Sequence, residues 1–295
     1  MDEMSRIFEE HRRLLEGIAY RMLGTLADAQ DVVQDTWLKW SRADAREIRE
    51  PRAWLVTVCS RLAMDVMKSA RRQRETYYGT WLPEPFLDER AANPAEQTHI
   101  DDTVSTALML ALEKLSPAER AAFLLHEVFA YRFEEIAAIL DKSEAACRKL
   151  ASRARMAVRA AKPRFEASPE EHHRLLDAFF KAAYAGDAEH LKTLLVESVE
   201  LHADGGGKVE TVATVLRGSE AVAQFFVRVL HERLAGRGEA KIVTRWFNGV
   251  PGALVYESGA LVTALSVAID AGAIHRIYAL RNPDKLAAFP NALPE

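Results

Sequence analysis

The hydrophobic pattern of this chain changes its period once, and the change divides the 295 residues into a helical part and a mixed part. In the first half, apolar residues recur at helical steps, as in Phe8, Leu15, Ile18 and Met22. After about residue 195 they alternate with polar neighbours, as a half-buried strand requires. This change of period predicts all-α domains followed by an α+β domain.

Helical periodicity fills residues 5–75, with a second helix at about Asp28–Trp40 and a third that begins near Pro51. The pattern stops in residues 76–103, where the run Trp81–Pro85 (WLPEP) holds two prolines that disfavour a helix. Because this stretch keeps aromatic and apolar side chains, it is more than a flexible tether. We predict an extended linker that docks on another part of the protein.

Helices resume near Val104, and a helix-turn-helix pattern follows. Ser116–Glu119 (SPAE) is a capping box with proline at the first helical position. Phe133–Leu140 predicts a short helix, Asp141–Ser143 a turn, and the residues up to Ala161 a longer helix. Aspartate at the turn tolerates the left-handed backbone that such a turn needs.

The longer helix is strongly basic, although the whole chain has a formal net charge of −4. Glu144 is the one acid between Lys142 and Arg164 in the sequence. The cations of the helix and of the residues just beyond it are Arg148, Lys149, Arg153, Arg155, Arg159, Lys162 and Arg164. A solvated face of a helical bundle would also carry such charges, but the turn spacing favours a helix that enters the major groove of DNA.

The last 130 residues predict the α+β domain. Ser168–Glu171 (SPEE) opens one or two helices over roughly 170–195, and a further helix is expected near 218–235. Turn signals at Asn248–Gly249 and Asp270–Gly272 separate strand-like runs. We expect these strands to form an antiparallel sheet.

Composition excludes several classes of protein. The two cysteines, Cys59 and Cys147, are far apart and lack CxxC spacing, so neither a disulfide framework nor a zinc site is expected. The start of the chain lacks the features of a signal peptide, and no apolar run approaches the length of a membrane span. We expect a cytoplasmic protein without membrane association, cofactor or metal.

The basic helix-turn-helix resembles region 4 of the extracytoplasmic-function sigma factors of bacterial RNA polymerase. The resemblance rests on the run FEEIA at Phe133–Ala137, on SRAR at Ser152–Arg155 and on the entry helices after Leu115. It implies that this region binds the −35 promoter element. Base edges would be contacted by Arg148, Lys149 and Ser152, and the DNA backbone by Arg153 and Arg155.

The N-terminal helices resemble region 2 of the same family. The segment Asp28–Trp37 matches the helix that binds the β′ clamp helices of the polymerase, which implies contacts by Asp31, Gln34 and Asp35. The segment Pro51–Glu75 matches the part that opens the −10 element, a task that requires cations for phosphates and a pocket for an extruded base. The cations are Arg61, Lys68, Arg71, Arg72 and Arg74.

The roles of two residues of region 2, Arg61 and Trp54, remain open. Many relatives carry asparagine at the position that matches Arg61, so the choice of base at the −10 element is not predicted. Trp54 serves either as a core anchor, which we favour, or as a platform for a base. The implied partners of the whole protein are promoter DNA and core RNA polymerase, through its β′ clamp helices and β flap.

The rest of the chain resembles the sigma-J type of this family, which carries a SnoaL-like extension of the NTF2-like superfamily. The resemblance implies four parts: region 2 at 1–75, the linker at 76–103, region 4 at 104–163 and a regulatory NTF2-like domain at 164–295. The extension would regulate the sigma modules of a protein that is monomeric when free. The residues that carry this resemblance are also the regulatory contacts that it implies: Trp81, Pro83, Pro85, Asp204, Lys208, Asp284 and Lys285.

An NTF2-like cone encloses a pocket, which leaves room for a small-molecule ligand in the C-terminal domain. Polar residues on its strands are His202, Asp204, Tyr256 and His275; we expect the two histidines to face outward, and His172–His173 to lie on the surface. The glycine run at 205–207 lacks the spacing of a P-loop, and we expect a loop that touches the sigma modules. A shared fold is not by itself evidence of catalysis, so no enzymatic activity is predicted. An autonomous DNA-binding regulator and an enzyme at 170–289 remain the alternatives.

Overall fold

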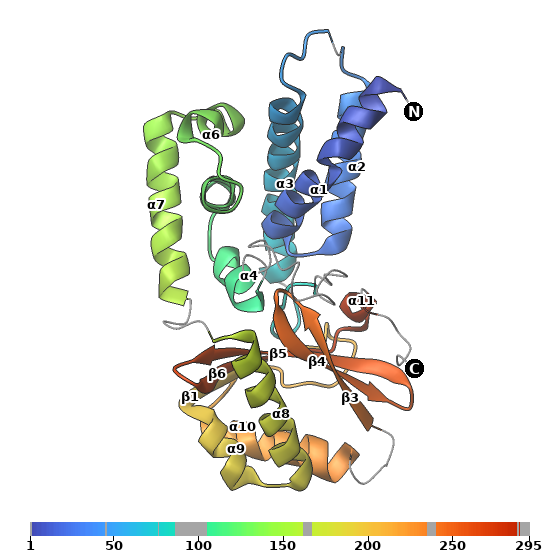
Figure 1. The fold of residues 1–295 in the computed structure, drawn as a ribbon, viewed down its shortest axis with the longest axis vertical. Helices are drawn as coiled ribbons and strands as arrows, with labels where there is room; N and C mark the ends of the chain where they lie inside the picture. Colours follow the sequence, from blue (N-terminus) through green and yellow to red (C-terminus); the bar gives the residue numbers. More distant parts are fainter. Residues whose placement is uncertain are drawn as a thin grey trace. The chain divides into compact units, whose positions relative to one another are not determined.

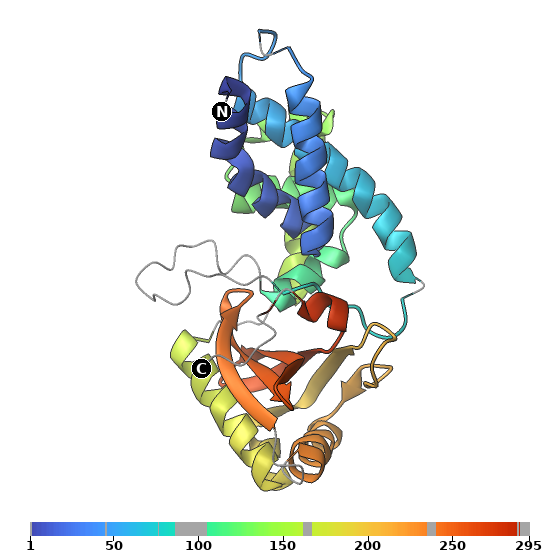
Figure 2. The same cartoon turned by 90° about the vertical axis from the view of Figure 1, so that its right-hand side faces the viewer.

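The computed structural model contains two compact units (Figures 1 and 2). One comprises residues 1–76 and 108–162, and the other residues 77–107 and 163–295. The structure describes residues 2–44, 46–75, 77–85, 105–161, 167–234, 240–287 and 289, with side chains left out at 70–75, 161, 232–234 and 240. In this described part, no helix is long and apolar enough to cross a bilayer.

The first unit begins with a three-helix bundle of α1 (Glu3–Leu23), α2 (Leu26–Ser41) and α3 (Pro51–Glu75), which lie side by side in Figure 1. The Asp2 carboxylate accepts a hydrogen bond from the Ser5 amide and so caps α1, which ends at Gly24 in the left-handed conformation. The predicted apolar face of α1, with Phe8, Leu15, Ile18 and Met22, lies in the bundle core, whereas α3 contributes Leu55, Val56, Cys59 and Ala63.

From residue 108 the same unit continues with most of α4 (Thr106–Glu113) and with α5 (Pro117–Phe123), a π-helical turn (Leu124–Val128), α6 (Phe133–Leu140) and α7 (Glu144–Ala161). The capping box at Ser116 is confirmed, because its hydroxyl accepts from the Glu119 amide while the Glu119 carboxylate accepts from the Ser116 amide. The predicted turn is also confirmed: Asp141 ends α6 with φ 52° and ψ 54°. Thus α6 and α7 form the helix-turn-helix.

The second unit is an α+β domain that contains one six-stranded sheet. Its helices are α8 (Pro169–Ala185), α9 (Ala188–Leu194), α10 (Ser219–Phe226), a π-helical continuation (Val227–Leu234) and α11 (Pro283–Leu286). Its strands are β1 (Leu195–Asp204), β2 (Leu216–Arg217), β3 (Ala240–Phe247), β4 (Val250–Glu257), β5 (Ala260–Asp270) and β6 (Ala273–Leu280). The expected domain class is the one observed.

The strand order is β2-β1-β6-β5-β4-β3, and it corrects one prediction. The strands from β3 to β6 are antiparallel meanders with turns at Asn248–Gly249 and Ala271–Gly272, where all four residues have positive φ. However, β1 and β6 pair in parallel, so the sheet is mixed and not antiparallel. A parallel pair needs a long crossover connection, and here most of the domain lies between the two strands.

The core of the second unit lies between the sheet and its helices. It is formed by apolar faces of α8, α9 and α10 together with alternate residues of the strands, including Val199, Leu201 and Ala203 as predicted for β1. Figure 2 shows these helices on one side of the curved sheet. The opposite face of the sheet also buries side chains, among them Leu254, Tyr256, Tyr278 and Leu280. A sheet with two covered faces leaves little room for outward-facing polar residues.

Candidate functional site

One polar face of α2 is exposed along its whole length. Asp31, Gln34 and Asp35 point to solvent, whereas Val32, Val33 and Thr36 on the opposite face are buried. The next residue on the exposed face is Leu38, which leaves 39% of its surface in water. Leu38 was not predicted from the sequence, although its spacing of three from Asp35 and four from Gln34 marks the same face. An apolar residue with a polar rim is typical of a protein interface.

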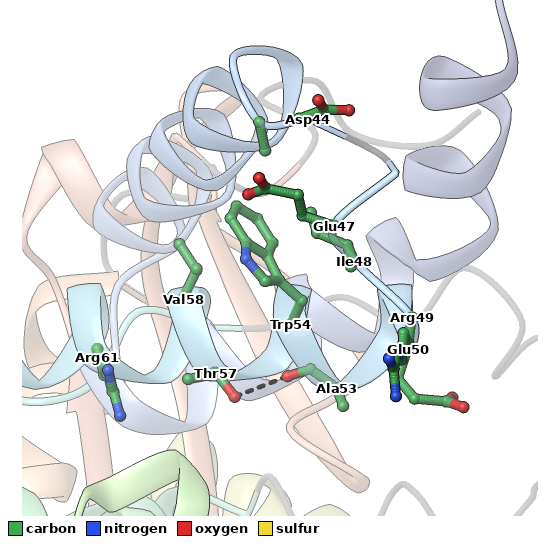
Figure 3. A pocket seen from close by; sticks show the side chains of 11 residues that line it. Asp44, Glu47, Ile48, Arg49, Glu50, Ala53, Trp54, Thr57, Val58 and Arg61 are labelled. Carbon is green, nitrogen blue, oxygen red and sulfur yellow. Dashed lines mark hydrogen bonds between the residues drawn. The ribbon is translucent and has the colours of Figure 1, made fainter.

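A pocket of about 630 Å³ lies between the 43–50 loop and α3 (Figure 3). Trp54, Ile48 and Val58 form its apolar wall, and Arg61 lines it from the next turn of α3. Trp54 is only half-buried, and its ring packs on Trp40 with centroids 5.4 Å apart. The core-anchor interpretation of Trp54 is therefore incomplete, because the same ring also faces the cavity.

The remaining predicted cations follow Arg61 along α3. Lys68 is exposed and its ammonium donates to Asp65 on the same helix at 2.7 Å. The side chains of Arg71, Arg72 and Arg74 lie outside the described residues. Arg61 itself is engaged within the unit, since its guanidinium donates to the backbone carbonyls of Ile139 at 2.8 Å and Ala138 at 3.1 Å. The predicted −10 cation thus contacts the helix-turn-helix.

The exposed face of α7 carries the three residues predicted to meet base edges. Arg148, Lys149 and Ser152 are all exposed, and the Arg148 guanidinium lies over the Phe133 ring, 4.7 Å from its centroid. Met156 extends this face, with 63% of its surface in water. Met156 was not predicted, because a basic helix face is recognised by its cations and not by an apolar residue at the same helical spacing.

Arg153 and Arg155 are held by carboxylates of the preceding helices. The Arg153 Nε donates to Glu119 at 2.8 Å, and Arg155 pairs with Glu127. Hydrogen bonds from Ser116 and Arg153 lower the pKa of Glu119, which therefore stays ionised and keeps this pair together. These two arginines are positioned by the fold, whereas Lys149 and Ser152 simply project from the helix.

In the second unit, the Asp204 carboxylate gathers the linker and the C-terminal segment around itself. It is fully buried. One oxygen accepts from the Tyr77 hydroxyl at 2.6 Å and the Gly206 amide at 3.0 Å. The other accepts from the Leu82 amide at 2.9 Å and the Lys285 ammonium at 2.7 Å. Four donors therefore compensate a charge that has no access to water.

Lys285 completes this buried cluster, which we call the linker clamp (Tyr77, Trp81, Leu82, Asp204 and Lys285). Its ammonium also donates to the Leu82 carbonyl at 2.6 Å and lies 4.5 Å from the centroid of the Trp81 ring. Burial, followed by the neighbouring Asp204 carboxylate, raises the pKa of the Tyr77 hydroxyl, so that it remains a donor. The predicted linker thus docks on the C-terminal domain.

The other predicted regulatory residues border the clamp. Pro83 and Pro85 are buried. Lys208 pairs with Asp284 of its own domain, and both side chains stay more than half exposed. A Cβ atom at Gly206 would lie 2.5 Å from the Asn282 amide nitrogen, and its φ is 63°, so the glycine run permits a tight turn beside the clamp.

Comparisons with known proteins show the family of this chain. Models of Sigma-70 region 2 and Sigma-70, region 4 match residues 7–73 and 105–158. The ECF RNA polymerase sigma factor SigJ of Mycobacterium tuberculosis is 38% identical over 96% of this chain and 93% of its own length. The chain belongs to the extracytoplasmic-function (ECF) sigma factors of RNA polymerase.

Further relatives cover the C-terminal domain as well. The probable ECF RNA polymerase sigma factor SigI of Mycobacterium tuberculosis is 31% identical over 97% of this sigma factor and 95% of its own length. The crystal structure of SigJ superimposes with a TM-score of 0.76 at 34% identity and covers 98% of this chain and all of the SigJ chain. The predicted family and fold are confirmed, and the protein is a transcription initiation factor that gives RNA polymerase its promoter specificity.

The C-terminal domain of this sigma factor contains a cavity of about 520 Å³ on the helix-covered side of the sheet. The four polar strand residues named above do not line it. Ala203, Val255 and Ala279 face the cavity, whereas His202, Asp204, Tyr256 and His275 are not among its lining residues. Successive residues of a strand point to opposite faces of the sheet. A shift of one residue therefore exchanges the side chains that face the cavity for those that face away from it.

One histidine differs from the prediction. Instead of lying on the surface, His172 is buried, and its desolvation lowers its pKa. His202 and His275 are half-buried, and desolvation lowers the pKa of both; His202 contacts the Glu200 carboxylate at 3.0 Å. Both histidines lie outside the cavity lining, as expected, but they are half-buried because the face of the sheet that carries them is also covered.

The linker clamp predicts the effect of removing its central charge. Asp204→Ala leaves the Lys285 ammonium buried without its counter-charge, a change that costs about 3–5 kcal/mol in typical buried pairs. We expect the linker to detach and chymotrypsin to cut at Trp81 much faster. The matched control is Asp284→Ala, which breaks an exposed pair and costs at most about 1 kcal/mol. Equal cleavage of the two variants would show that the buried pair does not hold the linker.

Proposed function

We propose that the exposed face of α2, with Asp31, Gln34, Asp35 and Leu38, binds the β′ clamp helices of core RNA polymerase, and that region 4 meets the β flap. The support is the composition of the α2 face: an apolar residue beside three acceptors on a rigid helix. The free sigma factor is a cytoplasmic monomer without membrane contact in this proposal.

The pocket beside Trp54 receives an extruded base of the −10 element. It is bounded by the aromatic ring of Trp54, on which a base can stack, and by the Arg61 cation, which suits a phosphate or a base edge. Lys68, Arg71, Arg72 and Arg74 continue along α3 as phosphate contacts. This pocket is the observation that carries the proposal for promoter opening, because strand separation requires a place for the unpaired base.

The exposed face of α7 binds the −35 element. Arg148 and Lys149 are suited to hydrogen-bond base edges, Ser152 donates or accepts, and the Met156 side chain suits a thymine methyl group. Arg153 and Arg155, held by Glu119 and Glu127, point their remaining donors at the DNA backbone.

The linker clamp gives the C-terminal domain control over promoter recognition. Two DNA-binding modules joined by one linker bind a promoter together only if the linker permits the right separation. By holding Tyr77 and Leu82 on Asp204, the C-terminal domain shortens the free length of that linker. The regulatory role of Trp81, Pro83, Pro85, Lys208 and Asp284 follows from their positions in and around the clamp.

The cavity of the C-terminal domain is the candidate site for a regulatory ligand. Phe180, Phe226 and Leu265 give it an apolar wall, and Arg281 also lines it. The Arg281 Nη1 donates to the Glu210 carbonyl at 2.6 Å, but its Nε is buried and has no hydrogen-bond partner among the described residues. An unpaired buried donor is costly, so a small apolar molecule with a carboxylate or carbonyl acceptor fits this site.

Run-off transcription with purified core polymerase tests the polymerase interface. The wild type gives promoter-dependent transcripts, and the double variant Asp31→Arg, Asp35→Arg loses polymerase binding and transcript by about tenfold or more, because charge reversal repels the partner face. Glu189→Arg, an exposed acid on α9, is the matched control and retains activity. Full activity of the double variant would refute the assignment of this face.

Base recognition by α7 is tested with Arg148→Ala and Lys149→Ala. Each variant, measured in the polymerase complex, weakens binding to the cognate −35 element by about 1–3 kcal/mol and relaxes the preference at one base pair. Ser105→Ala, a change outside α7, is the control. Equal loss on all sequences would assign both residues to phosphate contacts instead.

The ligand site is tested by calorimetric titration of the full chain with decanoate, an apolar chain with one carboxylate. We expect saturable binding with a stoichiometry of one and about tenfold weaker binding to Arg281→Met, because the cation and its unpaired donor are lost. The control is Arg217→Met, which removes an exposed arginine paired with Glu200. Absence of saturable binding, or equal affinity of both variants, would contradict this ligand class.

A further inference from the structure

The C-termini of helices α1 and α6 each present backbone carbonyls that have no donor within their own helix. Helix ends leave the last four carbonyls without intrahelical partners and carry a partial negative charge. In α1 the Gly24 amide bonds to the Tyr20 carbonyl. In α6 both Asp141 and Lys142 donate to the Ala137 carbonyl, which leaves the carbonyls of Ala138 and Ile139 beyond the reach of the helix's own amides.

An arginine from the other sigma region covers each of these ends. Arg61 of region 2 donates from Nε to the Ile139 carbonyl at 2.8 Å and from Nη2 to the Ala138 carbonyl at 3.1 Å, so it covers the end of α6 in region 4. Arg120 of region 4 donates from Nε to the Arg21 carbonyl at 2.9 Å in the last turn of α1. The contacts are reciprocal: each region supplies a cation to a negative helix end of the other.

Two cation–π contacts lie between the same two regions. Arg52 of α3 lies over the Tyr131 ring at 5.5 Å, and Arg21 of α1 lies over the Phe129 ring at 5.6 Å. Tyr131 and Phe129 both belong to the loop that leads into α6. Arginines therefore make the polar part of this interface on both sides.

The two capping arginines differ in exposure, and this difference assigns their roles. Arg120 is fully buried and pairs with Glu113, so it forms a permanent part of the packing. Arg61 is exposed at the rim, where water and other acceptors compete for its donors. Arg61 is also one of the residues that line the pocket beside Trp54, although its guanidinium points to α6 (Figure 3).

We propose that Arg61 is a releasable latch that holds region 2 and region 4 of the free sigma factor in a closed pair. While Arg61 caps α6, its donors are withheld from DNA, and region 4 is kept beside region 2. Opening exchanges the two carbonyl acceptors for promoter phosphate or base acceptors, which are at least as good partners for a guanidinium. Closure is thus an intrinsic property of the free chain. The link to promoter binding rests on the function proposed above.

The latch is tested by single-molecule energy transfer in the full-length free protein. Dyes are attached at Lys39→Cys on α2 and Ala157→Cys on α7, both exposed positions. The native thiols do not compete for the label, since both are buried and burial raises the pKa of Cys59 to about 12 and also raises that of Cys147. This readout needs neither polymerase nor DNA, so it stands or fails separately from the proposed promoter contacts.

We expect one high-transfer population in the parent protein and a roughly tenfold higher ratio of open to closed molecules in Arg61→Asn, which is too short to reach α6. Arg61→Lys, which keeps the charge but loses the two-pronged donor geometry, gives an intermediate ratio. Lys68→Asn, which removes an exposed cation of the same helix, leaves the ratio unchanged. Circular dichroism of each variant establishes that the helices are intact.

The proposal is overturned if Arg61→Asn keeps the parent distribution, because the closed pair would then depend on other contacts. It is also overturned if Lys68→Asn opens the pair to the same extent, because the effect would then reflect total charge and not the two carbonyl contacts.

Discussion

The C-terminal part of this sigma factor is organised around one carboxylate that is completely removed from water. A buried Asp204 without partners would be several kcal/mol unfavourable, and so would the buried Lys285 ammonium. The two groups pair with each other, and the linker completes their hydrogen bonds, because Leu82 supplies an amide to one and a carbonyl to the other. Folding of the end of β1 and docking of the linker are therefore coupled. A segment that leaves region 2 becomes a structural part of the C-terminal domain.

In the helical unit, backbone carbonyls at helix ends likewise depend on hydrogen-bond donors from distant segments. The ends of α1 and α6 create acceptors that the helices cannot satisfy themselves, and arginines from another region satisfy them. In both units, therefore, a local deficit of hydrogen bonds is resolved by a residue far away in the sequence. These hydrogen bonds connect region 2 with region 4, and the linker with the C-terminal domain.

Local signals accounted for much of the architecture. The capping box at Ser116, the left-handed turn at Asp141 and the turns at Asn248–Gly249 and Ala271–Gly272 depend on neighbouring residues only, and each was predicted where it occurs. The basic face of α7 was equally readable, because charge at helical spacing needs no tertiary information. Leu38 and Met156 lie on the same predicted faces, and attention to exposed apolar residues would have found them.

Errors arose where a choice depended on distant segments. Which side of β1 faces the cavity depends on where α8 and α10 pack, so Ala203 lines it and Asp204 meets the linker. The parallel pairing of β1 with β6 and the burial of His172 have the same origin. The amino-acid sequence by itself determined the order of helices, turns and charged faces, because these follow from short-range backbone and side-chain preferences. The tertiary structure alone decided the partners of Arg61, Asp204 and Lys285, because a buried or helix-end charge is satisfied by whichever group the fold brings within hydrogen-bond distance.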